Sequence, residues 1–245
     1  MKKYGLIGRP LGHSFSKKFF TEKFDREDIQ AQYDLYELPD ITHFEPLKNI
    51  PELCGLNVTI PYKQDVFAYL DEVDATAAEI GAVNVVKFIR HQGKLTLKGY
   101  NSDAIGFEHS IRPLLTVTHC KALILGTGGA SKAIDYTLRK LGLQTTFVSR
   151  TAKAGALTYH QLTADTLAEY HVIVNASPVG TFPHVDECPD IPYQYLTASH
   201  LLFDAVYNPA ETLFLKNGKA QGAQTLNGEG MLIGQAEAAW KIWNT

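Results

Sequence analysis

A short glycine-rich segment stands between a strand pattern and a helix pattern in the middle of the chain. Residues 121–134 read KALILGTGGASKAI. Gly126 permits a tight turn, Gly128 lets the backbone approach a pyrophosphate, and the following helix offers its first N–H groups to that anion. Ser131 stands where glycine or alanine is usual. An ordinary strand–helix turn would also contain glycines, but strand, loop, helix and next strand follow in order, so the segment predicts dinucleotide binding.

The end of the next predicted strand indicates which dinucleotide is bound. Enzymes that select NAD usually carry an acidic side chain there, which binds the ribose 2′-hydroxyl. Residues 147–151 read FVSRT and contain no acidic residue. Arginine pairs with a 2′-phosphate, which a carboxylate would repel, so Arg150 favours NADP(H). A solvated arginine at a strand end is the alternative.

A lysine stands where simple electrostatics disfavours it. Residues 57–63 read NVTIPYK, and proline is well tolerated in the first turn of a helix, so a helix is predicted to start at Pro61. Lys63 would then lie near the positive end of the helix dipole, at a cost of about 0.3–1 kcal/mol.

Further polar clusters follow predicted strands, where ligands bind in open α/β sheets. They cover residues 8–16, 57–63, 101–103, 175–180 and 207–209. Structural roles also fit some of these residues: Ser14 or Ser16 could cap a helix, and Asp103 suits a first helical turn.

Gln235 lies on the apolar stripe of the last predicted helix, four residues from both Met231 and Ala239. A glutamine in that position needs hydrogen-bond partners, because an unsatisfied buried group costs about 1–3 kcal/mol. A hydroxyl-rich ligand and a buried backbone carbonyl would serve equally well.

Composition excludes several classes of protein. The 245 residues suffice for one large or two small domains, and their hydrophobic content of 45% is typical of globular proteins. A formal charge of −3 without a basic run argues against a nucleic-acid partner. No apolar run reaches the length of a signal peptide or membrane span, so no membrane partner is expected. The scattered cysteines and histidines predict a cytoplasmic protein with reduced thiols and no metal site.

Strand and helix patterns alternate along the chain, which predicts β-α-β units and largely parallel sheets. The expected strands are residues 3–8, 32–38, 54–60, 83–90, 95–101, 121–126, 144–150, 171–177 and 200–207. A turn at 91–94 predicts a hairpin. A domain boundary is expected near residues 102–116, and the last helix, 229–243, could return to the first domain. We therefore expect two α/β domains with a cleft between them.

The chain resembles the shikimate dehydrogenase family over essentially its whole length, through a series of segments that match in sequence and in order. The matching segments are GRPLGHSFS (8–16), NVTIPYK (57–63), GAVN (81–84), GYNSD (99–103), GTGGAS (126–131), SRT (149–151), NASPVG (175–180), DAVYNP (204–209) and NGEGML-x-x-Q (227–235). The S-x-S, N-V-T-x-P-x-K and G-x-G-M-L-x-x-Q segments are far more specific than the glycine loop.

The resemblance implies a substrate-binding domain of residues 1–103 plus 227–245, and a Rossmann-type, doubly wound NADP-binding domain of residues 104–226. It implies an enzyme that interconverts 3-dehydroshikimate and shikimate by hydride transfer with NADP(H), within chorismate and aromatic amino-acid biosynthesis. The substrate would be the small-molecule partner, and the enzyme would be a monomer or a homodimer.

By position, the resemblance also implies roles for individual residues. Lys63 and Asp103 would be the catalytic pair, and Ser14 and Ser16 would hold the substrate carboxylate. The rest of the substrate pocket would be lined by Thr59, Asn84, Asp103, Tyr207, Gly228 and Gln235. The cofactor would be bound by Gly126, Thr127, Gly128, Gly129, Ala130, Ser149, Arg150 and Thr151, and by the backbone of Ala205 near the nicotinamide.

The chain departs from the family pattern in the cofactor half. The family commonly has Asn-Arg-Thr where this chain has Ser149-Arg150-Thr151, and a second arginine often found shortly afterwards is missing. Lys153 is the only cation nearby. The clamp on a 2′-phosphate is therefore expected to be weaker than is usual in the family.

Proton transfer offers a reason for the position of Lys63. Oxidation of a secondary alcohol needs a group that takes the hydroxyl proton, and reduction needs the same proton returned. Lys63 could do both, while Asp103 orients it and accepts a hydrogen bond from a substrate hydroxyl. Lys63 could also be only an orienting donor.

Two other functions stay open. A close relative could act on quinate or a similar hydroxylated acid, with relaxed use of NAD. A protein of another class would be a non-catalytic sensor of a metabolite and a nucleotide, but such a protein should tolerate loss of Lys63 and Asp103, and both are present.

Overall fold

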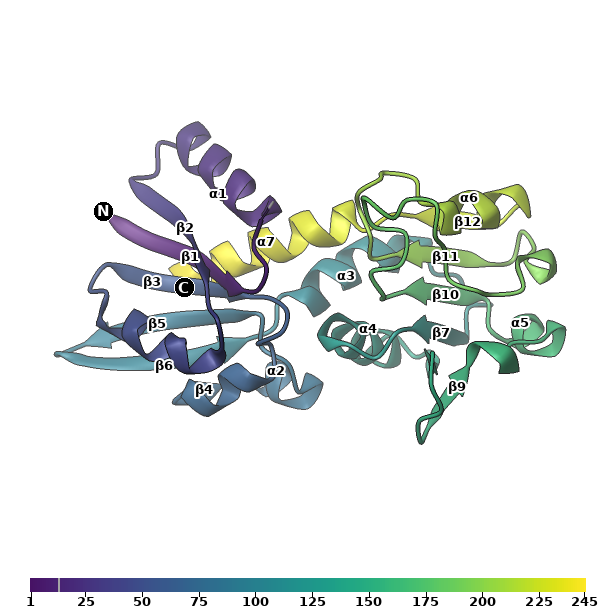
Figure 1. The fold of residues 1–245 in the computed structure, drawn as a ribbon, viewed down its shortest axis with the longest axis horizontal. Helices are drawn as coiled ribbons and strands as arrows, with labels where there is room; N and C mark the ends of the chain where they lie inside the picture. Colours follow the sequence, from purple (N-terminus) through teal and green to yellow (C-terminus); the bar gives the residue numbers. More distant parts are fainter. Residues whose placement is uncertain (13) are drawn as a thin grey trace. The chain divides into compact units, whose positions relative to one another are not determined.

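The computed structural model describes residues 1–12 and 14–245, and its contacts divide the chain into two compact units (Figure 1). The first unit comprises Met1–Ser102 and Ala236–Thr245, and the second comprises Asp103–Gln235. Contacts thus group Asp103 and residues 227–235 with the second unit. Their functional assignment to a substrate domain stays a prediction.

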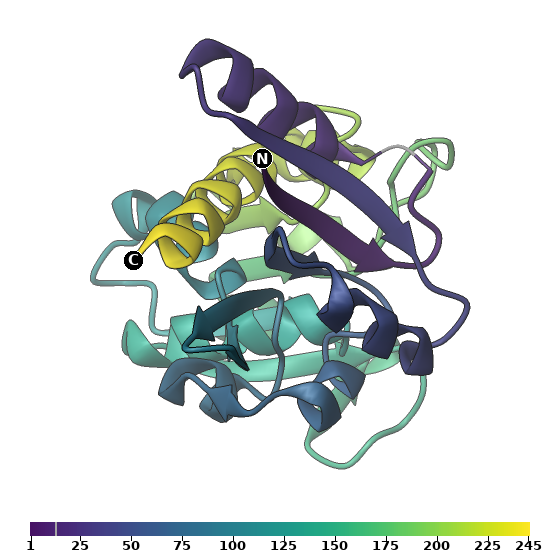
Figure 2. The ribbon, with the colours of Figure 1, turned by 90° about the vertical axis from the view of Figure 1, so that its left-hand side faces the viewer.

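The first unit contains a six-stranded mixed sheet in the order β2-β1-β3-β5-β6-β4. The strands are β1 (Lys2–Gly8), β2 (Ala31–Glu37), β3 (Leu53–Val58), β4 (Glu72–Val73), β5 (Val85–His91) and β6 (Lys94–Tyr100). β1 runs parallel to β2 (Figure 2) and also to β3, whereas β5 is antiparallel to β3 and β6. The expected hairpin is confirmed, and Gln92 and Gly93 at its tip both have positive φ, as a type I′ turn requires.

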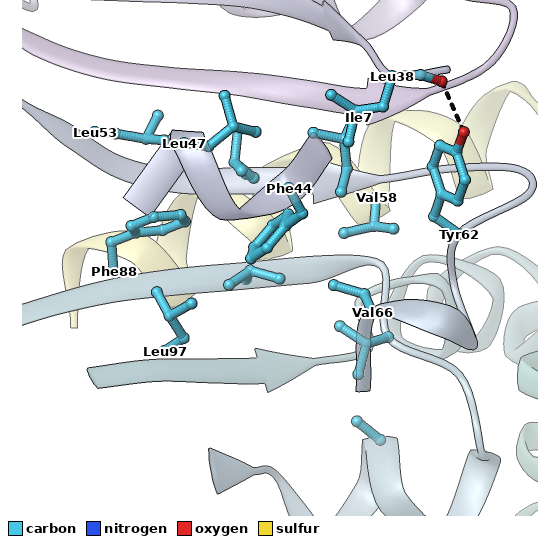
Figure 3. Packing of buried hydrophobic residues seen from close by; sticks show 14 residues of the cluster. Ile7, Leu38, Phe44, Leu47, Leu53, Val58, Tyr62, Val66, Phe88 and Leu97 are labelled. Carbon is cyan, nitrogen blue, oxygen red and sulfur yellow. Dashed lines mark hydrogen bonds between the residues drawn. The ribbon is translucent and has the colours of Figure 1, made fainter. Parts of the chain in front are cut away.

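Helices cover both faces of this sheet because side chains alternate along its strands. Tyr4 and Leu6 of β1 pack with α1 (Phe15–Arg26) and the end of α7 (Glu229–Asn244). Ile7 points to the opposite face, where it joins the cluster of Figure 3. The elements on that face are the 3₁₀ helices η1 (Ile41–Asn49) and η2 (Asp65–Tyr69) and the helix α2 (Ala75–Ile80).

An aromatic cluster fills the face of the first sheet that α1 and α7 cover. The ring centroid of Tyr4 lies 5.3 Å from that of Trp240 and 4.9 Å from that of Trp243. Phe20 and Phe24 of α1 pack on the same rings. Both tryptophans of the chain therefore lie in this cluster.

A buried ion pair between Lys23 and Glu237 joins α1 to α7. The Lys23 ammonium lies 2.9 Å from Glu27 and 3.0 Å from Glu237, although only 5% of Lys23 is exposed. A buried cation must be paired to be tolerated. The pairing holds α1, whose first turn follows Ser14, in a defined place.

The second unit contains an all-parallel sheet in the order β12-β11-β10-β7-β8-β9. Its strands are β7 (Lys121–Leu125), β8 (Gln144–Ser149), β9 (Ala156–Thr158), β10 (Val172–Asn175), β11 (Leu201–Asp204) and β12 (Gln224–Leu226). Numbered from β7, the order is 3-2-1-4-5-6 read from the other edge, which is the Rossmann order. The expected doubly wound fold is confirmed.

Helices also cover both faces of the second sheet. α3 (Asp103–Ile111) and α4 (Gly129–Lys140) pack on one face, with Met231 at the start of α7. α5 (Ala164–Glu169) and α6 (Leu213–Ala220) pack on the other. Short 3₁₀ helices lie at η3 (Arg112–Leu114), η4 (Tyr159–Gln161) and η5 (Tyr193–Tyr195).

Two turns with the same hydrogen-bond pattern precede strands β7 and β11. In each, a threonine N–H donates to the Nδ1 atom of a histidine three residues later: Thr116 to His119 at 3.1 Å, and Thr197 to His200 at 3.0 Å. The other ring nitrogens face carbonyl oxygens, of Ser199 for His119 and of Leu167 for His200. Because Nδ1 accepts and Nε2 donates, both imidazoles must be neutral to keep these bonds.

We expect His200 to make the protein less stable in mild acid. Burial lowers the pKa of His200, so the unfolded chain takes up a proton at a pH where the folded protein does not. The stability that neutral His200 contributes is complete above the ordinary histidine pKa. It is lost as the pH falls through the lowered pKa of His200 in the folded protein. The H200N variant, which keeps an acceptor for Thr197, should show a shallower loss of the denaturation midpoint between pH 7 and pH 5. An equal loss in H200N and in wild type would contradict the assignment, and H184N, at an exposed histidine, is the control.

Candidate active site

The carboxyl ends of β1 and β3 meet the amino end of β5 at one edge of the first sheet. Backbone bonds join them: Thr59 N–H donates to Ile7 O at 2.9 Å, and Val58 N–H donates to Asn84 O at 2.8 Å. The start of the predicted polar cluster 8–16, the cluster 57–63 and the family-matching segment 81–84 are thereby brought together.

The segment that contains Lys63 is not a helix, so the helix predicted to start at Pro61 is wrong. Residues 60–64 form turns, and the 3₁₀ helix η2 begins only at Asp65. The carbonyls of Ile60 and Lys63 accept bonds from Arg9 N–H and Val83 N–H instead of from the next helical turn. The helix-dipole argument for Lys63 therefore falls, and these bonds fix its half-buried position at the sheet edge.

The side chain of Asn84 joins the ends of β5 and β6. Its amide oxygen accepts from Ser102 N–H at 2.7 Å, and its amide nitrogen donates to the Ser102 hydroxyl at 3.0 Å. Asn101 beside it donates to Ala82 O at 2.9 Å. These residues are buried, so the bonds are needed to offset the loss of water.

Ser14 and Ser16 lie at the start of α1. Ser14 is the N-cap residue, and its hydroxyl oxygen accepts from Lys17 N–H at 3.3 Å. The structural role proposed for it is thus confirmed. A cap leaves the hydroxyl proton for another acceptor, because a serine hydroxyl both accepts and donates.

Asp103 and Gln235 are the first and last residues, along the sequence, of the second unit. Asp103 is the first residue of α3 and only 6% exposed, so the expected first-turn position is confirmed. Gln235 is 9% exposed, and its amide donates to Leu232 O at 3.0 Å. A backbone carbonyl is therefore one of the partners that a glutamine on this stripe requires.

The glycine loop follows β7, at the point where the strand order of the second sheet reverses. Gly126 has a φ of 119°, which favours glycine, and a Cβ there would lie 3.1 Å from Ala176 O. At Gly128 an added Cβ would meet nothing within 4 Å. Within the described residues, no side chain caps the start of α4. The loop therefore leaves room for an anion at a helix start, which fits a dinucleotide pyrophosphate.

Two cations lie beyond β8. Arg150 is exposed, and the adjoining Thr151 N–H bonds to the Ser149 hydroxyl at 3.4 Å. The Lys153 ammonium donates to the Thr127 hydroxyl at 3.0 Å. Lys153 therefore lies against the glycine loop.

The remaining predicted residues follow β11. Ala205 N–H donates to Asn175 O at 2.8 Å, and a Cβ on Gly228 would lie 2.3 Å from Ala205 O. Gly228 is thus required for close packing on the loop of Ala205. Tyr207, two residues after Ala205, is 40% exposed.

Asp204 organises these loops and was not predicted from the sequence. Its carboxylate accepts from Asn175 Nδ2 at 2.9 Å, from Val206 N–H at 3.0 Å and from the Thr212 hydroxyl at 2.5 Å. Burial raises the pKa of Asp204 to about 6, and the three hydrogen bonds oppose that rise. An acidic residue within the apolar run HLLFDAV was the available signal.

Within the part of the chain that the structure describes, no helix is long and apolar enough to cross a bilayer. No group of three histidine, cysteine or acidic side chains in residues 1–12 and 14–245 is placed to hold a metal ion.

These features define a dinucleotide-binding protein of the dehydrogenase class. They are a Rossmann sheet with a glycine loop at its reversal point, two cations beyond β8, and another α/β unit with a polar sheet edge. Comparisons narrow the class. Residues 6–86 match the family model described as "Shikimate dehydrogenase substrate binding domain". The chain is 36% identical to a shikimate dehydrogenase (NADP(+)) of Carboxydothermus hydrogenoformans, over 98% of this chain and 90% of that protein.

Solved structures agree with this. Shikimate 5-dehydrogenase from Thermus thermophilus, in complex with NADP(H) and shikimate, matches with a TM-score of 0.85 at 28% identity, over 99% of this chain and 93% of that one. Quinate dehydrogenase from Corynebacterium glutamicum, in complex with NAD, matches with a TM-score of 0.87 at 26% identity, over 99% and 93%. The chain belongs to the shikimate dehydrogenase family.

Replacing Asp204 should loosen the loops beyond the second sheet. D204A leaves three donors without their acceptor, at about 1–3 kcal/mol for each donor that stays buried. We expect a clear fall in the free energy of unfolding, measured with urea. The control is D186A, at an exposed carboxylate, and a D204A protein as stable as D186A would contradict the organising role.

Proposed function

We propose that this chain interconverts 3-dehydroshikimate and shikimate by hydride transfer with NADP(H), in the biosynthesis of chorismate and aromatic amino acids. The observation that carries the proposal is the pairing of two features in one chain. One unit gathers the polar segments around Lys63 and Asn84 at a sheet edge. The other has a Rossmann sheet with an uncapped glycine loop.

The substrate is assigned to the polar edge of the first sheet and to residues that follow it in the family motifs. Ser14 and Ser16 hold the carboxylate through their hydroxyl groups. The residues assigned to the ring hydroxyls and the rest of the pocket are Thr59, Asn84, Asp103, Tyr207, Gly228 and Gln235. Family membership and the shared sheet edge of Thr59 and Asn84 support this assignment.

The cofactor is assigned to the second unit. The backbone of residues 126–130 and the start of α4 bind the pyrophosphate. Ser149, Arg150 and Thr151 bind the adenosine side, with Arg150 and Lys153 facing the 2′-phosphate. NADP⁺, when bound, supplies the hydride acceptor.

Lys63 and Asp103 are assigned the proton. As the carbinol carbon gives up a hydride, Lys63 accepts the proton of its hydroxyl, and in the reverse direction it returns that proton to the oxygen. Asp103 orients Lys63 and accepts a hydrogen bond from a neighbouring substrate hydroxyl.

The first test follows NADPH formation by absorbance with shikimate and NADP⁺. Wild type should turn over, and K63A should lose about 10²–10⁴-fold in kcat, the usual contribution of a positioned acid–base group. K94A, at the exposed hairpin, is the control. A K63A rate close to wild type with an unchanged pH profile would remove Lys63 from the chemistry.

Cofactor choice is tested at the two cations. R150A and K153A should each raise KM for NADP⁺, because a charge-assisted hydrogen bond contributes about 1.5–3 kcal/mol, and the KM for NAD⁺ should change little. R139A, at an exposed arginine of α4, is the control. Equal effects on both cofactors would show that neither cation reads the 2′-phosphate.

The second candidate is action on quinate, with relaxed use of NAD. The similarity to a quinate dehydrogenase in complex with NAD is the observation that favours it, and parallel assays with quinate and NAD⁺ decide between the substrates. Saturable binding without turnover on any pair would favour a sensor instead. The cytoplasmic location and the choice between monomer and homodimer stay predictions.

A further inference from the structure

Two helices that carry proposed substrate residues meet at a glycine. Gly106 lies on α3, and a Cβ on it would lie 2.3 Å from Met231 O and 2.7 Å from the backbone nitrogen of Gln235 on α7. Distances this short to backbone atoms leave no room for a side chain, so this close approach requires glycine. All three residues belong to the second unit. The family-matching segments do not include Gly106.

Gly234 lies on the α7 side of the same contact. A Cβ on Gly234 would lie 3.0 Å from the Cα atom of Gly106. One turn earlier along α7, a Cβ on Gly230 would lie 2.9 Å from the hydroxyl oxygen of Ser110. The backbones of α3 and α7 therefore touch at Gly106 and Gly234, whereas a side chain lies between them at Gly230.

This contact places Gln235 beside the turn of α3 that begins with Asp103. Residues three apart lie on the same face of a helix, so Asp103 shares the face that Gly106 turns towards α7, one helical turn away. Both polar residues are buried. The Gln235 amide donates to Leu232 O, and because an amide can make several hydrogen bonds, this one does not prevent another to a ligand hydroxyl.

We propose that Gly106 is a positioning residue for substrate binding, whose lack of a side chain lets α7 come close enough for Gln235 to bind the same substrate molecule as Asp103. The inference rests on the proposed function, in which both residues line the substrate pocket. A side chain at Gly106 would push the backbone of α7 away and move Gln235 relative to Asp103. A displacement of about 1 Å takes a hydrogen bond out of its normal range of length.

The G106A variant tests the proposal. We expect KM for shikimate to rise about three- to tenfold, as for the loss of one hydrogen bond. KM for NADP⁺ should change much less, because its phosphates are assigned to residues 126–130 and 149–153, outside α3 and α7. G234A should act in the same direction but more weakly, because its overlap with α3 is smaller. G230A is the matched control and should change KM little, since a serine hydroxyl can rotate away.

A double-mutant cycle separates positioning from a general loss of packing. Q235A should raise KM for shikimate in wild type and in G230A, where Gln235 is in place. In G106A the glutamine is already displaced, so adding Q235A should change KM much less. The close contacts of a Cβ on Gly106 involve only backbone atoms and the Cβ of Gln235, which Q235A keeps. A general loosening of the two helices would therefore let Q235A multiply KM by the same factor in both backgrounds.

The outcomes distinguish this inference from the proposed function. No turnover of shikimate by wild type refutes both. Turnover by wild type, with KM for shikimate unchanged in G106A or with an equal effect of Q235A in both backgrounds, refutes the role of Gly106 alone. If G106A does not fold, the same cycle in G234A decides, and a full effect of Q235A there overturns the role. Loss of folding in both variants would also overturn it, because glycine would then be needed for the fold itself.

Discussion

Hydrogen bonding of buried polar groups is the constraint on which the candidate site depends. Asn57, Asn84, Asn101 and Ser102 are each at most 4% exposed, yet they lie where strands of the first sheet end. Inside a protein such groups must find partners, and an unsatisfied one costs about 1–3 kcal/mol. The bonds of Asn84 to Ser102 and of Asn57 to Tyr33 meet this demand and, in doing so, fix the backbone around Thr59 and Lys63.

In the second unit, the buried polar group that needs hydrogen-bond partners is the carboxylate of Asp204. Asp204 accepts hydrogen bonds from three donors in two segments, the end of β10 and the connection between β11 and α6, and none of the donors is a cation. The buried carboxylate is therefore held by hydrogen bonds alone, and burial raises its pKa accordingly. The loops of Asn175 and Val206, which flank the proposed nicotinamide region at Ala205, are fixed by this one side chain.

Regular periodicity made most of the fold predictable. All nine expected strands exist, as do the hairpin, the glycine loop at a reversal point and the last helix. The strands β4, β9 and β12 were missed because two or three residues are too few to show alternation. The helix expected at Pro61 failed because a local rule cannot foresee that distant N–H groups, of Arg9 and Val83, would take the carbonyls of this segment.

The candidate site was predictable only where residues fall in motifs. Thr59 and Lys63 follow β3, whose carboxyl end lies beside that of the parallel strand β1, and Asn84 precedes the antiparallel strand β5, so these three residues lie at one edge. Tyr33 and Asp204 act through side-chain hydrogen bonds to partners 24 and 29 residues away. Spacing along the chain carries no signal for such pairs, so only the structure could reveal them.

The aromatic cluster beneath α1 has a spectroscopic consequence. Trp240 and Trp243 are the only tryptophans of the chain, and both lie in the first unit. Intrinsic tryptophan fluorescence therefore monitors the surroundings of that unit, whereas far-ultraviolet circular dichroism averages over both. Non-coincident transitions by the two methods would indicate that the units unfold in separate steps.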